Sequence, residues 1–249
     1  FNASLPYNNC QLTIAAKLLL EEKVSWFYIK QSDNSALATK KRKNVSLENP
    51  YKNEFKAGAT LRPRAFCFIE MNQETPNDFK DRVLNVKTAV DIQEDAKVPW
   101  KDLSFQGIID SQFVFLTAIS KSILPFNLFS PDLILLPVVI KDNKLQLLEP
   151  YELISKGFLN THKWFQTVEN IWQIKRTELN KQYTAVQYLN YQNKIISQNL
   201  SKRFLVLYNS SAKDANSTIL DREELTLEFI ADHKTYWFAT DIEEEALYI

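Results

Sequence analysis

Residues 133–148 read Leu-Ile-Leu-Leu-Pro-Val-Val-Ile-Lys-Asp-Asn-Lys-Leu-Gln-Leu-Leu and carry the clearest strand pattern in the chain. The aliphatic and β-branched run Leu133–Ile140 is typical of a strand, and Lys144–Leu148 resumes the apolar pattern. Between them, Lys141-Asp142-Asn143 supplies residues that favour a tight turn. We therefore predict a β-hairpin at this position, ended by Pro150.

Shorter strand patterns flank this hairpin on both sides. Before it lie Val24–Ile29, Ala65–Met71, Val83–Val90 and Phe105–Ile109, and after it lie Arg203–Tyr208, Thr226–Ala231 and Tyr236–Ala239. Residues 113–119 are apolar without a clear period, so they fit either a helix or a buried strand.

Helical periodicity is concentrated in the middle of the chain. Apolar residues recur every three or four positions in Tyr151–Lys156, His162–Lys181 and Thr184–Gln198, and in one earlier segment, Gln11–Glu22. Trp164 and Trp172 share one face of the central pattern, so we expect both in the core.

Together these patterns predict a mixed α+β fold, with β-rich segments at both ends and a helical section in the middle. We expect a boundary near Pro150. It would separate a β-rich lobe with a basic loop, residues 1–150, from a helical section followed by short strands, residues 151–249. One continuous domain is the alternative.

The composition excludes several kinds of binding site. The 249 residues carry 30 Lys+Arg and 30 Asp+Glu, which argues against a histone-like binder but leaves room for one basic face. Only 3 glycines occur, and no Gly-x-Gly-x-x-Gly, P-loop or Phe-x-Gly-x-Gly turn is present. A nucleotide or S-adenosylmethionine site of the usual form is therefore not expected. The 2 cysteines do not make a disulfide framework.

The sequence contains no membrane-spanning pattern. Its most apolar run, Leu133–Ile140, is interrupted by Pro137 and is far shorter than the ~20 residues of a span. We expect a protein without a membrane partner, in a cytoplasmic setting.

The histidines and carboxylates do not form a catalytic pattern. His162 and His233 have no partners spaced as in a Ser-His-Asp triad or a zinc site. Asp132, followed by Asp142-Asn143-Lys144, superficially fits a magnesium-dependent nuclease, but Asp142 and Asn143 fall at the predicted turn. We predict no catalytic residue and no metal ligand, and the nuclease stays an alternative.

Several short segments resemble segments of a known protein family and occur in the same order along the chain. They are Tyr51–Arg64, which ends in Gly-Ala-Thr-Leu-Arg-Pro-Arg, then Lys97-Val-Pro-Trp-Lys101, Phe105–Asp110, Leu124-Pro-Phe126, Trp164–Trp172, Leu189–Lys194, Val206–Asn209, Ile230–Trp237 and Glu243–Tyr248. In this order they resemble the C-terminal part of large bacterial N6-adenine DNA methyltransferases, which include the fused type IIG restriction–modification enzymes. The resemblance covers residues 51 to the end.

The resemblance implies a target-recognition region downstream of a methyltransferase core, with double-stranded DNA and that core as partners. The family's Asn/Asp-Pro-Pro-Tyr/Phe motif, which holds the flipped adenine, is missing from the sequence, and the nearest string is Glu48-Asn49-Pro50-Tyr51. We therefore expect this region to be non-catalytic by itself, with S-adenosylmethionine bound by the parent enzyme. Phe1 at the start and Ile249 within an apparent helix fit a piece of a longer chain.

If DNA is bound, phosphate contacts should come from Lys and Arg in loops and turns. The candidates are Lys40, Lys41, Arg42 and Lys43 in a polar loop over residues 31–53, Arg62 and Arg64 around Pro63, and Lys97, Trp100 and Lys101. Each group has a structural alternative, respectively a solvated loop, an ion pair that holds the turn, and a packing anchor. The alternative function is a protein-interaction scaffold between domains of the same enzyme.

Overall fold

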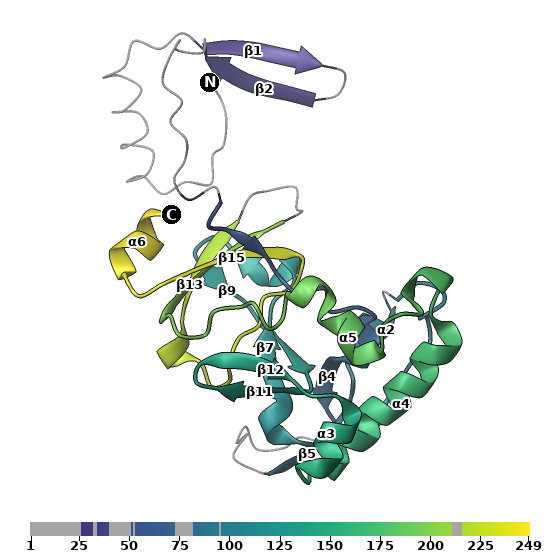
Figure 1. The fold of residues 1–249 in the computed structure, drawn as a ribbon. Coiled ribbons are helices and arrows are strands. Elements are labelled where there is room, and N and C mark those ends of the chain that lie inside the picture. The colour runs from purple at the N-terminus through teal and green to yellow at the C-terminus, as the bar shows by residue number, and fades with distance from the viewer. Residues whose placement is uncertain are drawn as a thin grey trace. The chain divides into compact units, whose positions relative to one another are not determined.

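The computed structural model describes residues 51, 53–72, 82–94, 96–210 and 216–249, and the backbone of 26–31 and 34–39 (Figure 1). The chain divides into two compact units, residues 1–49 and 50–249. The helix expected at Gln11–Glu22 and the basic run Lys40–Lys43 lie outside the described residues.

The first unit contains an antiparallel pair of strands, β1 (Trp26–Gln31) and β2 (Asn34–Thr39). The prediction of an uninterrupted loop from residue 31 to 53 is therefore wrong for β2. The β2 sequence, Asn-Ser-Ala-Leu-Ala-Thr, has little strand propensity of its own, so its pairing with β1 outweighs local preference.

The second unit is built on two antiparallel sheets. The first has the order β6-β5-β4-β10-β7, formed by β4 (Phe68–Met71), β5 (Val83–Thr88), β6 (Gln106–Asp110), β7 (Val114–Thr117) and β10 (Asp132–Leu135). The second has the order β14-β13-β15-β3, formed by β3 (Lys56–Ala57), β13 (Phe204–Asn209), β14 (Ser217–Asp221) and β15 (Thr235–Thr240). Two small hairpins complete the strands, β8 (Ile123–Leu124) with β9 (Asn127–Leu128), and β11 (Val138–Lys141) with β12 (Lys144–Leu147).

Most of the helical residues lie between the strands of the two sheets in sequence. The α-helices are α2 (Val90–Glu94), α3 (Pro150–Ser155), α4 (Leu159–Lys175), α5 (Ala185–Leu189) and α6 (Glu243–Tyr248). Short 3-10 turns are η1 (Arg64–Phe66), η2 (Ser111–Phe113), η3 (Ser120–Ser122), η4 (Glu178–Asn180), η5 (Tyr191–Asn193) and η6 (Arg222–Glu224). The structure confirms the α+β class, with strands on both sides of the α3–α5 section.

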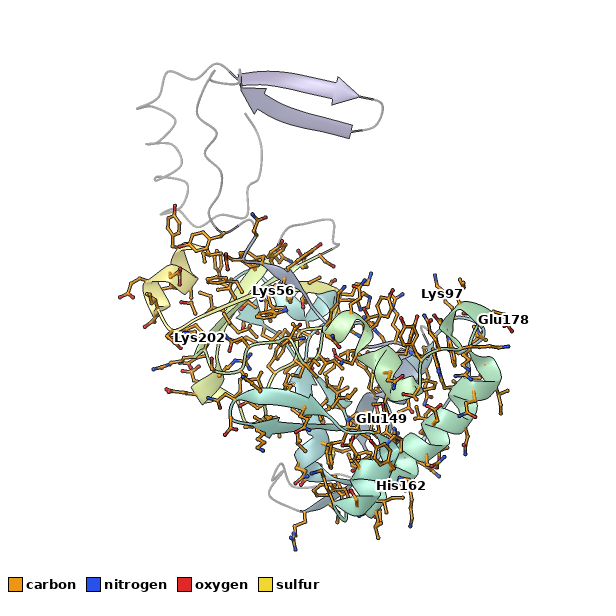
Figure 2. All side chains as sticks on the ribbon, viewed as in Figure 1. Lys56, Lys97, Glu149, His162, Glu178 and Lys202 are labelled. Carbon is orange, nitrogen blue, oxygen red and sulfur yellow. The ribbon has the colours of Figure 1, made fainter. Side chains whose placement is uncertain are left out.

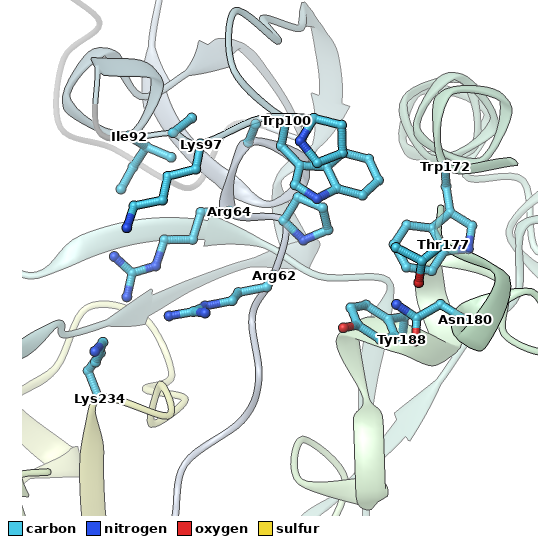
Figure 3. A pocket seen from close by; sticks show the side chains of 14 residues that line it. Arg62, Arg64, Ile92, Lys97, Trp100, Trp172, Thr177, Asn180, Tyr188 and Lys234 are labelled. Carbon is cyan, nitrogen blue, oxygen red and sulfur yellow. The ribbon is translucent and has the colours of Figure 1, made fainter. Parts of the chain in front are cut away.

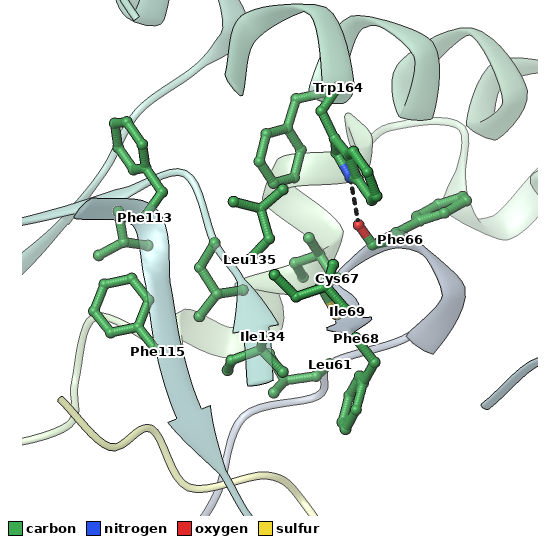
Figure 4. Close-up of a cluster of buried hydrophobic side chains, with 14 of the residues drawn as sticks. Leu61, Phe66, Cys67, Phe68, Ile69, Phe113, Phe115, Ile134, Leu135 and Trp164 are labelled. Atoms are coloured by element: carbon green, nitrogen blue, oxygen red, sulfur yellow. Dashed lines mark hydrogen bonds between the residues drawn. The ribbon is translucent and has the colours of Figure 1, made fainter. Parts of the chain in front are cut away.

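Helix α4 packs its apolar face onto the first sheet. Trp164 and Trp172 are 5% and 1% exposed, as the sequence predicted, and Phe165 and Val168 are fully buried between them. The Trp164 Nε1–H donates to the backbone oxygen of Phe66 over 2.9 Å (Figure 4). At the start of the helix, the Asp110 carboxylate accepts from both the backbone and the hydroxyl of Thr161.

The predicted hairpin at 133–148 is only half right. Its turn and second strand form as predicted: Asp142 and Asn143, with positive φ angles of 51° and 57°, join β11 to β12. The first half is not one strand. It is split into β10 and β11, which belong to different sheets, because the chain turns at Leu136-Pro137, where proline has no N–H for a ladder.

Three other segments differ from the sequence prediction. The helix expected over 162–181 ends at Lys175, and the one over 184–198 ends at Leu189, where Asn190 leaves the helical backbone conformation; Gln192 and Asn193 beyond it take positive φ. The strand expected over 226–231 makes one isolated bridge, between Phe229 and Leu116. There the Gln198 amide binds both the N–H and the oxygen of Ala231, at 2.8 and 2.9 Å, and the Ala59 N–H shares that oxygen.

Pro150 lies inside the second unit, as the first residue of α3. Leu148 before it and Leu153 after it belong to the same buried cluster. The chain on both sides of Pro150 therefore contributes to one buried cluster. None of the helices in the described ranges has the length and apolar character required to cross a membrane.

Candidate functional site

The site begins where residues 57–64 run alongside residues 231–235. The Ala59 N–H donates to Ala231 oxygen over 2.7 Å, and the His233 N–H donates to Ala59 oxygen over 2.8 Å. Gly58 permits this approach, because a Cβ there would lie 2.2 Å from the backbone oxygen of Asp232. The pairing brings two distant stretches of sequence together, one carrying Arg62 and Arg64 and the other carrying Lys234 (Figure 3).

Next to this pairing lies a cavity of about 440 Å³. A volume in the range of ~300–1,000 Å³ is typical of small-ligand sites. Its lining comes from the turn before η1, the connection after α2, the α4–α5 region and the turn before β15, namely Arg62, Pro63, Arg64, Ala65, Ile92, Ala96, Lys97, Pro99, Trp100, Trp172, Thr177, Asn180, Tyr188 and Lys234.

One side of the cavity is cationic. Figure 3 shows the charged ends of Arg62, Arg64, Lys97 and Lys234 on this side. Among the described residues that line the cavity, none is acidic. Glu178, the first residue of η4, does not line the cavity and is paired with Lys181 at 2.7 Å.

The two arginines differ in their contacts. Arg64 binds the fully buried Asp232 through Nη2 at 3.2 Å, and its guanidinium lies 5.1 Å from the Phe68 ring centre. Arg62 is exposed, and within the described part of the chain its side chain has no hydrogen bond or ion pair. Lys97 is exposed and equally unpaired among those residues. The charges of Arg62 and Lys97 can therefore act on a ligand, whereas Asp232 largely compensates that of Arg64.

The other side of the cavity is aromatic. Trp100 stacks on Trp172 with ring centres 5.6 Å apart and planes 12° apart, and Tyr188 lies 4.6 Å from Trp172. The Trp172 Nε1–H donates to Tyr183 oxygen over 2.9 Å, which fixes its ring. Thr177 and Asn180 place a hydroxyl and an amide beside these rings.

The connection that carries Lys97 and Trp100 is held against the end of α4. The Lys175 ammonium donates to Pro99 oxygen over 2.9 Å, and the Trp100 N–H donates to Lys97 oxygen over 2.8 Å. The Phe66 ring meets Trp100 edge-on at 5.4 Å. These contacts give the cavity a wall that is supported from both the helix and the first sheet.

Four of the residues that the sequence suggested for DNA contact line the cavity, and the others do not or lie outside the described residues. Arg62, Arg64, Lys97 and Trp100 all line the cavity, whereas Lys101 is exposed outside its lining, and Lys40, Lys41, Arg42 and Lys43 lie outside the described residues. Arg64 makes an ion pair, which was the structural role considered as the alternative to DNA contact. Trp100 packs on Trp172, as its structural alternative predicted, and it also lines the cavity.

Among the polar and aromatic lining residues, sequence reasoning missed four and gave a fifth only a role in the core. Thr177, Asn180, Tyr188 and Lys234 were not singled out, and Trp172 was assigned to the core alone. Of these residues, Lys234 alone could have been proposed from the sequence, since it follows the polar turn at Asp232-His233. The residues of the α4–α5 region have no local motif that marks them.

The groups considered for catalysis are not among the described residues that line the cavity. His162 sits in the first turn of α4, at the end opposite Glu178, and its Nδ1 lies 2.9 Å from Pro150 oxygen (Figure 2). His233 Nδ1 lies 3.1 Å from Asp232 Oδ2. Asp142 and Asn143 form the β11–β12 turn, and the described residues contain no group of three His, Cys, Asp or Glu side chains able to hold a metal ion.

Comparison of the chain with protein-family models, with curated proteins and with solved structures found no significant match.

Proposed function

We propose that this chain is a DNA-recognition region that binds double-stranded DNA through the cationic side of the cavity. The observation that carries the proposal is the convergence of Arg62 and Lys97, both exposed and unpaired among the described residues, with Arg64 and Lys234. The chain is otherwise neutral, with 30 basic and 30 acidic residues, so this clustering is local and not a consequence of composition.

The chemistry of these side chains suits a phosphate backbone. Arginine presents a planar fork of donors that matches phosphate oxygens, and lysine supplies a mobile point charge. Contacts of this kind position a protein on the duplex, and side chains that reach base edges then read the sequence. Arg62 and Lys97 are assigned the phosphate contacts. Arg64, held by Asp232, keeps the turn in place beside them.

The resemblance to N6-adenine DNA methyltransferases extends this proposal to a parent enzyme. In that setting the methyltransferase core is the partner that binds S-adenosylmethionine and the target adenine, and this region contributes DNA recognition without transferring methyl groups itself. A setting in the cytoplasm follows from the same proposal.

The test is the affinity for a labelled duplex at ~50 mM salt, measured by fluorescence anisotropy. Arg62→Ala and Lys97→Ala should each weaken binding severalfold, because each removes one phosphate contact. Lys144→Ala is the matched control, since Lys144 is exposed at the β12 end of the small hairpin and does not line the cavity. Unchanged affinity in both cavity variants would overturn the assignment of these two residues.

A second candidate function is a protein-interaction scaffold within the same enzyme. It is favoured by the β8–β9 hairpin, which exposes Leu124, Phe126 and Phe129 at 40%, 76% and 64%. Absence of duplex binding at low salt would contradict the DNA proposal and favour this alternative.

A further inference from the structure

The aromatic side of the cavity is not explained by contacts to a phosphate backbone. Trp100 and Tyr188 are only partly buried, and both are supported by the buried ring of Trp172. Aromatic rings held in fixed planes offer a surface on which a nucleobase can stack. Bases inside a duplex expose only their edges in the grooves, so they cannot reach such a surface.

The cavity has a charged side and an aromatic side, which match the two ends of a nucleotide. Its cationic side, with Arg62 and Lys97, faces a side formed by Trp172, Tyr188 and Asn180 (Figure 3). A nucleotide has the same division, with an anionic phosphate at one end and a flat, uncharged base at the other. The lack of an acidic side chain in the described lining suits the phosphate.

Asn180 adds a group that can read the edge of a base. Within the described residues its side-chain amide makes no hydrogen bond, although its backbone groups are used. An amide has one acceptor and two donors, which can pair with a base edge. The Thr177 hydroxyl lies in the same part of the lining.

We propose that the cavity accepts one nucleotide of the bound DNA that has left the base stack. Its base stacks against Trp100 and Tyr188, the edge of the base meets Asn180, and the two phosphates that flank it in the strand lie at Arg62 and Lys97. This inference rests on the proposed function and goes beyond it, because duplex binding by the cationic residues alone needs no aromatic cavity.

The test compares three DNA probes that share one duplex sequence: the fully paired duplex, the duplex with one bulged adenosine, and the duplex with an abasic bulge. Both bulges bend the duplex, so the ratio of their affinities isolates the contribution of the base. The chain should bind the bulged adenosine roughly tenfold more tightly than the abasic bulge, as stacking on one aromatic platform allows.

Variants locate the effect in the cavity. Trp100→Ala should bring the ratio close to one, and Trp100→Phe, which keeps an aromatic face, should retain most of it. Asn180→Ala should reduce the ratio without touching the packing of Trp172. Lys144→Ala is the control that should leave the ratio unchanged. Thermal melts of each variant identify any loss of folding, and Asn180→Ala keeps the test valid if Trp100→Ala does not fold.

The outcomes separate this inference from the proposed function. A ratio near one, with tight and salt-dependent binding of the paired duplex, would overturn the nucleotide cavity and leave DNA recognition standing. No binding of any probe would overturn the proposed function. A further arm uses free deoxyadenosine monophosphate. If it binds as tightly as the bulged adenosine probe and in a Trp100-dependent manner, the ligand is a free nucleotide and the assignment to DNA is wrong.

Discussion

Gly58 lies where two backbone segments approach more closely than a side chain allows. A Cβ at this position would meet the oxygens of Asp232 and Ala231 at 2.2 and 2.5 Å. Both are backbone atoms, which cannot rotate away. The position therefore requires glycine, because no side chain fits between the two segments. Their close approach places Arg62 and Lys234 in the lining of the same cavity.

We predict that Gly58→Ala lowers the free energy of unfolding by about 1–3 kcal/mol, the usual cost of overpacking. It should also weaken DNA binding, since the two segments must separate. Chemical denaturation of the two proteins measures the first effect. Gly107→Ala is the control, because no atom of the described residues lies within 4 Å of a Cβ there, and it should be close to neutral. Equal stability of Gly58→Ala and the parent chain would contradict the packing argument.

Asp132 carries the clearest pH dependence. Burial raises its pKa from 3.8 to about 6, the negative charge of Asp91 adds to the rise, and Lys121 and Arg64 oppose it. Its Oδ2 is buried and has no hydrogen-bond partner among the described residues. A raised pKa in the folded state means that the protonated form is favoured by folding, so stability is lost as the pH rises from about 4 to about 6.

Asp132→Asn should remove this loss because asparagine stays neutral. The variant should be more stable than the parent at pH 7, by about 1 kcal/mol, since partial exposure screens the carboxylate. The gain should shrink as the pH falls from about 6 to about 4. Denaturation curves over this range test it, with Asp102→Asn, at an exposed position, as the control. A gain independent of pH would contradict the burial argument.

At the scale of elements, α4 organises both the core and the cavity. Its buried face covers the first sheet, and its last residue, Lys175, donates to Pro99 oxygen over 2.9 Å. This hydrogen bond from a charged donor holds the connection over residues 96–100, which supplies Lys97 and Trp100. The position of residues 96–100 in the cavity wall therefore depends on where α4 ends.

We predict that Lys175→Met speeds hydrogen exchange at the backbone amides of residues 97–101 by roughly tenfold, in line with the loss of one charge-assisted hydrogen bond. Exchange in β13 should stay unchanged, because that strand lies in the other sheet. Lys163→Met, also on α4 and exposed, is the matched control. Equal protection of residues 97–101 in the two variants would show that the hydrogen bond does not hold the connection.

The elements that sequence patterns predicted well are those decided by local residues. The 142–143 turn and the apolar face of α4 follow from turn chemistry and helical spacing. The errors occur where a distant contact overrides the pattern. Leu133–Ile140 reads as one run, but its two halves pair with different partners, and Ala231 reads as strand, but Gln198 occupies its backbone groups.

At the scale of the whole molecule, the cavity joins four stretches that are far apart in sequence. Arg62, Lys97, Tyr188 and Lys234 come together only because the segment after Gly58 lies against Asp232 and the α2–β6 connection lies against α4. The basic turn and the Lys97–Trp100 cluster could be predicted from residue type. The position of Tyr188 and Asn180 beside them could not be predicted, since no local pattern encodes the proximity of residues 80 or more positions apart in the sequence.

The central claim is that the cationic side of this cavity binds the phosphates of duplex DNA. The salt dependence of affinity tests it most directly, because each phosphate contact contributes about 0.9 to the slope of log affinity against log salt. We predict that the double variant Arg62→Ala/Lys97→Ala lowers the magnitude of this slope by about 1.8 relative to the parent chain, with Lys144→Ala unchanged. Parallel lines for the parent and the double variant would contradict the claim.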